Sequence, residues 1–373
     1  MLPSINDPVL IDTPEKLKDL VTILEKEKRL AVDTEANSLH AYYERVCLIQ
    51  FSTPFEDYLV DPIVMDDLTY LGPIFSNPAI ETVFHAVEYD LIGLQRDFAF
   101  TFANIFDTMV AARTLGYKQV GLASLLLDKF GIEIDKHNQK ADWGVRPLSP
   151  SMVSYAGIDT HYLLELRDIL QAELEEKGLW QLAQEDFKRA CFVTNINNHP
   201  QKASWEKVDG RKDLDAQQLA VLNELCVCRN KIASKMNRPV FKVLDDKVLM
   251  KLVLAEINNY AEFEAAGMTE KQLNRFGQTM YDALMRGRHA PPVKPTETER
   301  LPESQVKRLQ KLKLWRKERA KLLEVESDVV LPKVYMQTIA QTRGLTPEKL
   351  AKLMADTPWR YQQYGPDILA ALS

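Results

Sequence analysis

Long hydrophobic runs are absent from this sequence of 373 residues. Nowhere do about 18 apolar residues follow one another, which is close to the length that a membrane-spanning helix requires. The first residues also lack the basic segment and apolar core of a secretory signal. We therefore expect neither a membrane anchor nor export.

Cysteine and histidine are scarce, and neither forms a metal-binding pattern. The sequence has four cysteines and six histidines. Cys226 and Cys228 are separated by one residue, which is the wrong spacing for a zinc knuckle, and His137, His161 and His199 form no ligand cluster. Because thiols stay reduced inside cells, this usage predicts free cysteines and a cytoplasmic location.

Charge is divided unevenly along the chain. Residues 1–200 contain 17 Lys and Arg against 31 Asp and Glu, whereas residues 201–373 contain 30 against 22. The acidic half fits a site built from carboxylates, and the basic half is suited to polyanions. The densest basic stretch is Lys307–Lys321, for which a solvated helix face is the alternative interpretation.

Residues 30–177 alternate between strand and helix patterns. We expect strands at Leu30–Thr34, Val46–Ser52, Asp57–Val60, Ala79–Phe84 and Ile105-Phe106, the first three as an antiparallel meander. Helices are expected near 66–76, Tyr89–Phe98, from Asp107, Leu122–Phe130 and Ser149–Lys177. This order predicts an α/β domain around a mixed sheet.

After about residue 210 the sequence becomes helical and repeats itself. Residues 225–229 resemble residues 312–316, and residues 275–284 resemble residues 363–372, at offsets of 87 and 88. Two matches at nearly one offset predict a duplicated helical module. We place the boundaries at 1–205 for the α/β domain, 213–289 and 301–373 for the modules, and 290–300 for a proline-rich linker.

Four carboxylates and a tyrosine are the candidate catalytic residues. Asp33 and Glu35 lie two apart on a strand, so both side chains point to one face of the sheet. Tyr155 and Asp159 lie four apart on a helix and share one of its faces. Asp90 starts another helix. Each pattern alone also suits a structural role, and their occurrence in this order is what favours a common site.

Gathered carboxylates impose a chemical requirement. Close negative charges repel, so some of these groups would take up protons unless a cation joined them. Oxygen-only ligands suit hard divalent ions, which here means Mg²⁺ or Mn²⁺. The arrangement therefore predicts two-metal phosphodiester hydrolysis.

The order Asp-x-Glu, His-x4-Asp and Tyr-x3-Asp resembles the exonuclease motifs of the DEDD superfamily, tyrosine subclass. Residues 139–148, followed by residues 155–163, resemble ribonuclease D in particular. The helical modules resemble the helicase-and-RNase-D C-terminal (HRDC) domain, the first more closely than the second. The resemblance implies a ribonuclease-H-like exonuclease domain followed by two all-α HRDC-like domains.

The same resemblance implies a role for each motif residue. Asp33, Glu35 and Asp159 would hold the ion that activates water, and Asp33 with Asp90 would hold a second ion near the leaving oxygen. Tyr155 would orient the nucleophile, because a phenol with a pKa near 10 is a poor base at neutral pH. The implied reaction releases nucleoside 5′-monophosphates from RNA 3′ ends.

Substrate contacts are assigned to His85, Gln139 and Lys140, although a core position suits His85 equally well. The expected partner is RNA with a free 3′ end, such as a transfer RNA precursor or another structured RNA. No protein partner is specified. Two alternatives remain open, namely a DNA 3′–5′ exonuclease of the same superfamily and a nucleic-acid-binding protein without catalysis.

Overall fold

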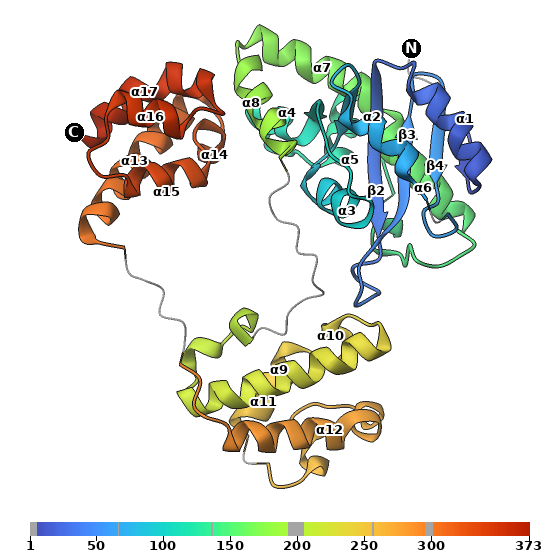
Figure 1. The fold of residues 1–373 in the computed structure, drawn as a ribbon, viewed down its shortest axis with the longest axis vertical. Helices are drawn as coiled ribbons and strands as arrows, with labels where there is room; N and C mark the ends of the chain where they lie inside the picture. The colour runs from blue at the N-terminus through green and yellow to red at the C-terminus, as the bar shows by residue number, and fades with distance from the viewer. Residues whose placement is uncertain (1–5, 66, 136, 193–204, 256, 295–300) are drawn as a thin grey trace. The chain divides into compact units, whose positions relative to one another are not determined.

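The computed structural model describes residues 6–65, 67–135, 137–192, 205–255, 257–294 and 301–373 (Figure 1). The chain divides into two compact units, one of residues 1–35, 46–196 and 300–373 and the other of residues 36–45 and 197–299. Among the described helices, none combines the length and apolar character needed to cross a bilayer.

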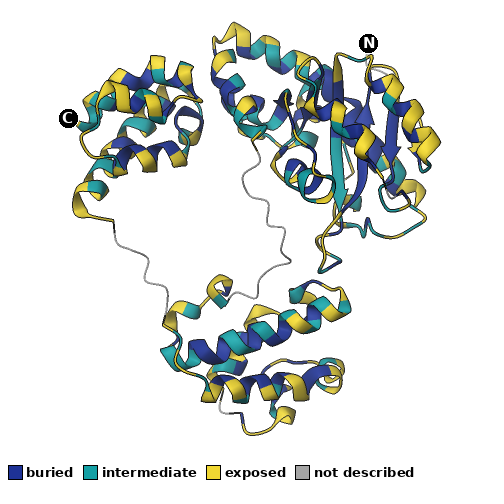
Figure 2. Cartoon of the chain, in the orientation of Figure 1, coloured by how far each residue is buried: buried dark blue, intermediate teal, exposed yellow. Residues whose placement is uncertain are grey.

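A six-stranded sheet forms the centre of the first unit (Figure 1). Its order is β1-β4-β3-β2-β5-β6, with β1 and β5 parallel to their neighbours and β3 antiparallel to β4. Strands β3 and β4 are buried along their whole length, whereas the second half of β2 is only partly buried (Figure 2). The bounds are β1 (Val9–Ile11), β2 (Arg29–Ala36), β3 (Val46–Ser52), β4 (Asp57–Val60), β5 (Glu81–Phe84) and β6 (Ile105–Asp107).

The mixed sheet agrees with the expectation from sequence. Strands β3 and β4 have the predicted bounds, and β2 is longer than predicted at both ends. Strand β1 was not predicted. It has only three residues, two of them exposed, which is too short to show an alternation of apolar and polar residues.

Alternation along β2 decides which face carries the candidate residues. Leu30 and Val32 pack into one core, with α1 (Pro14–Leu24) and α3 (Glu88–Phe98). Ala31 packs into a different core, with helices from the opposite side of the sheet. Since strand side chains alternate, Asp33 and Glu35 follow Ala31 to that second face. The helices of the second core are α4 (Thr108–Thr114), α5 (Leu122–Phe130), α7 (Leu163–Glu176) and α8 (Trp180–Ala190).

The long helix expected over Ser149–Lys177 is broken into two helices. Helix α6 (Pro150–His161) is capped by Ser149, whose hydroxyl accepts a hydrogen bond from the backbone N–H of Met152. Tyr162 interrupts the helix at φ −102° and ψ 2°, and α7 follows. Tyr162 is buried, and the centre of its ring lies 6.1 Å from the centre of the Phe130 ring. The break in the helix therefore coincides with tertiary packing of this side chain.

The helix expected near 66–76 is also shorter than predicted. The structure has a single 3₁₀ turn, η1 (Thr69–Leu71), followed by α2 (Gly72–Ser76), and residue 66 lies outside the described residues.

The second unit holds the first helical module. Side chains of Asp215 and Thr269 cap its two long helices, each with a glutamine three residues later that completes a reciprocal capping box. Its helices are α9 (Ala216–Met236), α10 (Val240–Val243), α11 (Asp246–Leu254), η5 (Tyr260–Phe263) and α12 (Glu270–His289).

The second module repeats the first in structure. Arg229 donates to the carbonyl oxygen of Leu244 at 2.8 Å, and Arg316 donates to that of Leu331 at 2.9 Å, so both partners keep the offset of 87 residues. Its helices are α13 (Glu303–Leu323), α14 (Ser327–Val330), α15 (Lys333–Gln341), α16 (Pro347–Leu353) and α17 (Pro358–Leu372).

The second module belongs to the same compact unit as the α/β domain. Arg360 of α17 is fully buried and donates to Glu185 at 3.0 Å and to Asp186 at 2.7 Å, both on α8. Glu185 also accepts from the backbone N–H of Trp359 at 2.6 Å. A buried ion pair therefore joins the second module to the α/β domain, although the two elements that form it are far apart in sequence.

Candidate active site

The structure brings the five predicted residues close to one another. Asp33 and Glu35 come from β2, Asp90 from the first turn of α3, and Tyr155 and Asp159 from α6. Each of these side chains is influenced electrostatically by at least one of the others. Three separate segments of the chain therefore converge, and the catalytic role of these five residues stays a prediction.

Burial and mutual repulsion raise the pKa of the two central aspartates. Burial is the larger cause for Asp33, followed by the negative charge of Asp159. Burial also leads for Asp90, followed by the charge of Asp33. Both pKa values lie well above the ordinary range of an aspartate.

The other two carboxylates respond in the same way. Burial raises the pKa of Glu35 to about 10, with further contributions from the charges of Asp33, Asp159 and Asp90. Burial raises the pKa of Asp159 to about 7, against a lowering by its hydrogen bond with Tyr155. Without a cation, protons are therefore held at the site at neutral pH.

Tyr155 links the aromatic and acidic parts of the site. Burial, and then the charges of Asp159 and Glu35, raise the pKa of the Tyr155 phenol well above its ordinary value. The phenol therefore keeps its proton and donates it in the hydrogen bond to Asp159. Its ring lies 6.1 Å from that of Trp143, a packing residue that is almost completely buried.

A residue that the sequence analysis did not select positions Asp90. Thr34, between the two carboxylates of β2, donates from its hydroxyl to the Asp90 carboxylate at 2.5 Å. This bond lowers the pKa of Asp90 against the effects of burial and neighbouring charge. By strand alternation the Thr34 side chain points to the opposite face of β2 from Asp33 and Glu35. Helix α3 packs on that face and brings Asp90 to the Thr34 hydroxyl.

Asp107 holds the turn that leads into α3. Its carboxylate accepts from the backbone N–H groups of Ala86 and Val87, both at 3.0 Å, and also caps α4. Ala86 adopts φ 63°, a conformation that costs energy for a residue with a side chain. An aspartate at the start of a helix is a common cap, so the sequence indicates that role for Asp107. The hydrogen bonds from Asp107 to the turn before Asp90 have no such local signal.

His85 lies at the end of β5, close to the same turn. Its Nδ1 is 2.9 Å from the hydroxyl oxygen of Thr108, and that hydroxyl donates to the carbonyl of Phe84. Nδ1 therefore carries the proton, because the Thr108 oxygen must accept. Burial lowers the pKa of His85, so the ring is neutral at pH 7 with Nε2 as its acceptor.

Gln139 and Lys140 lie in η2 (His137–Lys140), and both are exposed. Their neighbour Asn138 donates to the carbonyl of Ser151 at 3.0 Å, which ties this turn to the start of α6. The role of Gln139 and Lys140 in substrate binding stays a prediction.

Arg146 anchors the loop that precedes α6, a role that the sequence analysis did not assign. Its guanidinium donates to both carboxylate oxygens of Asp61, at 2.5 and 2.8 Å, and to the carbonyl of Cys47 at 2.6 Å. Such paired donation fixes orientation as well as position. The loop is thereby held to β3 and to the residue that follows β4.

The donor set fits a hard divalent cation in its chemistry. Four carboxylates supply oxygen ligands only. Their pKa values are raised because burial and mutual repulsion disfavour the ionised forms, and a bound cation would stabilise those forms. Among the described residues, no three or more His, Cys, Asp and Glu side chains already surround a common point. The fit therefore rests on the kind and closeness of the ligands.

Comparison with protein families identifies the domains. Residues 8–175 match the 3′–5′ exonuclease family, and residues 218–284 and 305–372 each match the HRDC domain. Both helical modules are matched, although the sequence analysis found the first to be the closer. DEDD-type exonucleases use divalent metal ions, in agreement with the donor set.

Among curated relatives, the exosome complex exonuclease RRP6 of Saccharomyces cerevisiae is 40% identical over 172 residues. That match covers 46% of this chain and 24% of the yeast protein. Across the curated relatives compared, the chain spans from 20% to 42% of their length. The similarity thus concerns part of longer proteins.

Two solved structures are similar over most of the chain. The catalytic core of RRP6 from Trypanosoma brucei is 26% identical, with a TM-score of 0.68 and coverage of 77% of this chain and 83% of that one. Escherichia coli RNase D is 21% identical, with a TM-score of 0.69 and coverage of 96% and 100%. The likeness to RNase D therefore concerns the fold, and the subclass expected from sequence is not fixed by it.

Proposed function

From a chain that carries a DEDD-type 3′–5′ exonuclease domain and two HRDC domains, we propose a two-metal exoribonuclease that shortens RNA from its 3′ end. Water adds to the terminal phosphodiester phosphorus, and the bond to the 3′ oxygen of the preceding nucleotide breaks. The products are a nucleoside 5′-monophosphate and an RNA that is one nucleotide shorter and ends in a 3′ hydroxyl.

The carboxylates would hold two Mg²⁺ or Mn²⁺ ions. We assign Asp33, Glu35 and Asp159 to the ion on the side of the attacking water, and Asp33 with Asp90 to the ion on the side of the leaving oxygen. When bound, such ions supply charge neutralisation and Lewis-acid polarisation for an in-line displacement. Thr34 keeps Asp90 oriented for this task through its hydrogen bond.

Tyr155 orients the water in this proposal. Its phenol stays protonated because burial and nearby carboxylates raise its pKa. It therefore acts through a directed hydrogen bond. His85, neutral and with Nε2 as an acceptor, is assigned to a hydroxyl of the terminal nucleotide, and Gln139 and Lys140 to the phosphate backbone.

The single observation that carries the proposal is the mutual repulsion of four buried or half-buried carboxylates gathered from β2, α3 and α6. Burying such charges without a structural partner is costly, so their closeness needs a functional reason. RNA is preferred as substrate because relatives such as yeast RRP6 are named exosome exonucleases. The same names make an exosome-type complex a candidate partner.

The proposal is tested with RNA labelled at either end, with and without Mg²⁺. A 3′–5′ exoribonuclease gives a ladder from 5′-labelled RNA and labelled mononucleotide from 3′-labelled RNA, and both disappear in excess chelator. Internal cleavage or activity in chelator would contradict it. Transfer RNA precursors and other structured RNAs are the natural substrates to compare, and a fluorescent fusion tests the cytoplasmic location.

Two alternatives are separated by matched assays. A DNA exonuclease of the same superfamily would degrade a DNA oligonucleotide faster than RNA of equal sequence. A non-catalytic nucleic-acid-binding protein would bind RNA yet take up no manganese in calorimetry. All five motif residues are present, which favours catalysis over this second alternative.

A further inference from the structure

A glutamine in the centre of the sheet carries two buried polar atoms without partners. Gln50 belongs to β3 and is 0% exposed. Neither Oε1 nor Nε2 of its amide forms a hydrogen bond with any described residue, and no other side chain in the described ranges leaves two buried polar atoms unpaired. Because an amide that is buried without hydrogen bonds destabilises a fold, a glutamine in this condition requires an explanation.

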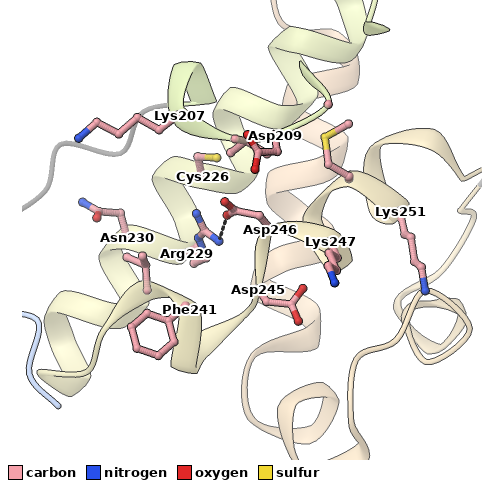
Figure 3. A pocket seen from close by; sticks show the side chains of 14 residues that line it. Lys207, Asp209, Cys226, Arg229, Asn230, Phe241, Asp245, Asp246, Lys247 and Lys251 are labelled. Carbon is pink, nitrogen blue, oxygen red and sulfur yellow. Dashed lines mark hydrogen bonds and ion pairs between the residues drawn. The ribbon is translucent and has the colours of Figure 1, made fainter. Parts of the chain in front are cut away.

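Two other buried polar side chains show the usual arrangement. In the first HRDC module, Arg229 lines a cavity of about 870 Å³ and donates to the carboxylate of Asp246 at 2.7 Å (Figure 3). In the exonuclease domain, Oγ of Ser52 lies 2.7 Å from Oγ1 of Thr160 on α6. Ser52 is only two residues from Gln50 on the same strand, so a polar side chain next to Gln50 does find a partner on α6.

Gln50 points from β3 toward helix α6. Ile49 and Phe51, on either side of it, pack into the core on the other face of the sheet. In the register of the sheet, Gln50 lies opposite Leu59 of β4, and Leu59 packs in one cluster with Ala156 of α6. Because residues directly opposite each other share a face, the amide of Gln50 lies beneath α6.

Asp33 points to the same face from the neighbouring strand, β2. Leu30 and Val32 pack into the same core as the two neighbours of Gln50, so Asp33 points away from that core, as Gln50 does. The negative charge of Asp159 on α6 acts on Asp33. The same helix therefore covers both side chains.

Along the strands, Gln50 lies nearer to Asp33 than to Glu35. A hairpin joins β2 to β3, and its neck is closed by two hydrogen bonds. The N–H of Asn37 donates to the carbonyl of Arg45 at 3.3 Å, and the N–H of Arg45 donates to Oδ1 of Asn37 at 2.9 Å. The two strands run back side by side from this neck, from which Glu35 is two residues away, Asp33 four and Gln50 five.

Asp33 also lacks the side-chain partner that two of the other carboxylates have. Asp90 accepts from the hydroxyl of Thr34, and Asp159 accepts from the phenol of Tyr155. Within the described residues, no side chain donates to Asp33, and only the backbone N–H of Thr34 favours its ionised form. A carboxylate that binds ions can accept further hydrogen bonds, because its two oxygens carry about four acceptor sites.

We propose that Gln50 is a positioning residue of the metal site, and that its amide N–H donates to the carboxylate of Asp33 when the ions are bound. The unpaired donor and the carboxylate without a side-chain partner lie on adjacent strands, on one face and under one helix. A hydrogen bond to a ligand carboxylate fixes its orientation, and the negative charge strengthens the bond. The inference rests on the proposed two-metal function and adds a residue to its site.

Gln50→Met tests the proposal, because it keeps the length of the side chain and removes both polar atoms. Manganese affinity should fall by roughly 10- to 100-fold, the usual effect of losing a residue that orients a metal ligand. The Tm of the protein in chelator should stay the same or rise, because the variant removes an unpaired buried amide. Calorimetry with manganese and thermal unfolding in chelator measure the two effects.

A matched control makes the same substitution on α3. Oε1 of Gln95 is also buried without a partner among the described residues. Gln95→Met should leave the manganese affinity at the value of the unaltered protein. Equal losses of affinity in the two variants would overturn the proposal, because the loss would then not depend on the position beside Asp33.

A spectroscopic measurement follows the Gln50 amide directly. Its side-chain amide resonance in ¹⁵N-labelled protein is identified by its absence in Gln50→Met. The resonance should shift when Mg²⁺ is added, because the amide gains a charged acceptor, and the resonance of Gln95 should not. A Gln50 resonance that stays in place on saturation with Mg²⁺ would overturn the proposal.

Two further outcomes separate this proposal from the proposed function. An unchanged manganese affinity in Gln50→Met, or a lower Tm in chelator, would overturn the positioning role, and the lower Tm would assign Gln50 to packing. The exoribonuclease function would stand in both cases, provided that the unaltered protein binds manganese and cleaves RNA. If the unaltered protein takes up no manganese, both proposals fail.

Discussion

The hydroxyl of Thr34 donates a hydrogen bond of 2.5 Å to the carboxylate of Asp90. The two residues are 56 positions apart and belong to β2 and α3. The bond favours the ionised form of Asp90, the form that a cation requires. It makes Thr34 a positioning residue for the proposed metal site.

Replacing Thr34 with Val removes this bond and keeps the shape of the side chain. We expect manganese affinity and exonuclease activity to fall by roughly 10- to 100-fold, as is usual when a residue that orients a metal ligand is lost. Thr34→Ser should retain most of both. Calorimetry with manganese measures the affinity, and an unchanged value in Thr34→Val would contradict the positioning role.

Asp33→Asn should nearly abolish cleavage, because Asp33 is the carboxylate proposed to contact both ions. RNA binding should persist, since the proposed RNA contacts lie elsewhere. Excess chelator should reproduce the loss in the unaltered protein. Robust hydrolysis in chelator would exclude the two-metal reaction.

Tyr155→Phe keeps the ring and removes only the hydroxyl. The rate should fall by ~10²–10⁴, the usual effect of losing a group positioned for proton transfer. Manganese affinity should barely change, because Tyr155 is not proposed as a ligand. A much weaker manganese titration in this variant would show that its role was assigned wrongly.

The metal-free protein should become less stable as the pH rises. The folded-state pKa of Asp159 is about 7 and that of Glu35 about 10, both above the ordinary values near 4. These groups bind protons more tightly in the folded state, so their stabilising effect is present below pH ~4 and is lost as pH rises through their folded pKa values.

Added Mg²⁺ should reverse this loss, because it replaces the protons. The difference in Tm between samples with Mg²⁺ and with chelator should therefore grow between about pH 5 and pH 8. Thermal unfolding at several pH values measures it. Asp159→Asn should reduce the pH dependence of Tm in the sample with chelator. An equal increase in Tm on adding Mg²⁺ at about pH 5 and at about pH 8 would contradict the expectation.

Arg360→Ala should destabilise the first unit by about 3–5 kcal/mol, because it leaves the buried Glu185 without its positively charged partner. The double variant with Glu185→Gln should recover part of this loss. Arg113→Ala, at a half-exposed pair with Asp328, is the matched control and should cost about 0–1 kcal/mol. Chemical denaturation measures all three, and equal effects at the two pairs would contradict the burial argument.

The sequence by itself determined the local order of the site. Spacings of two on a strand and four on a helix place Asp33 with Glu35 and Tyr155 with Asp159, because those periods follow from backbone geometry alone. The offset of 87 residues predicted the duplication that Arg229 and Arg316 display in their matching bonds. The bounds of strands β3 and β4 were predicted from their apolar residues, because a run of such residues is itself a local feature of the sequence.

Only the tertiary structure decided which distant groups meet. The bond between Thr34 and Asp90, the bridge from Asp107 to Ala86 and the burial of Arg360 against Glu185 all join segments with no periodic relation in the chain. The break at Tyr162 also has no cue in a continuous helical pattern. Long-range packing fixes these features, whereas neighbouring residues fix only the local period.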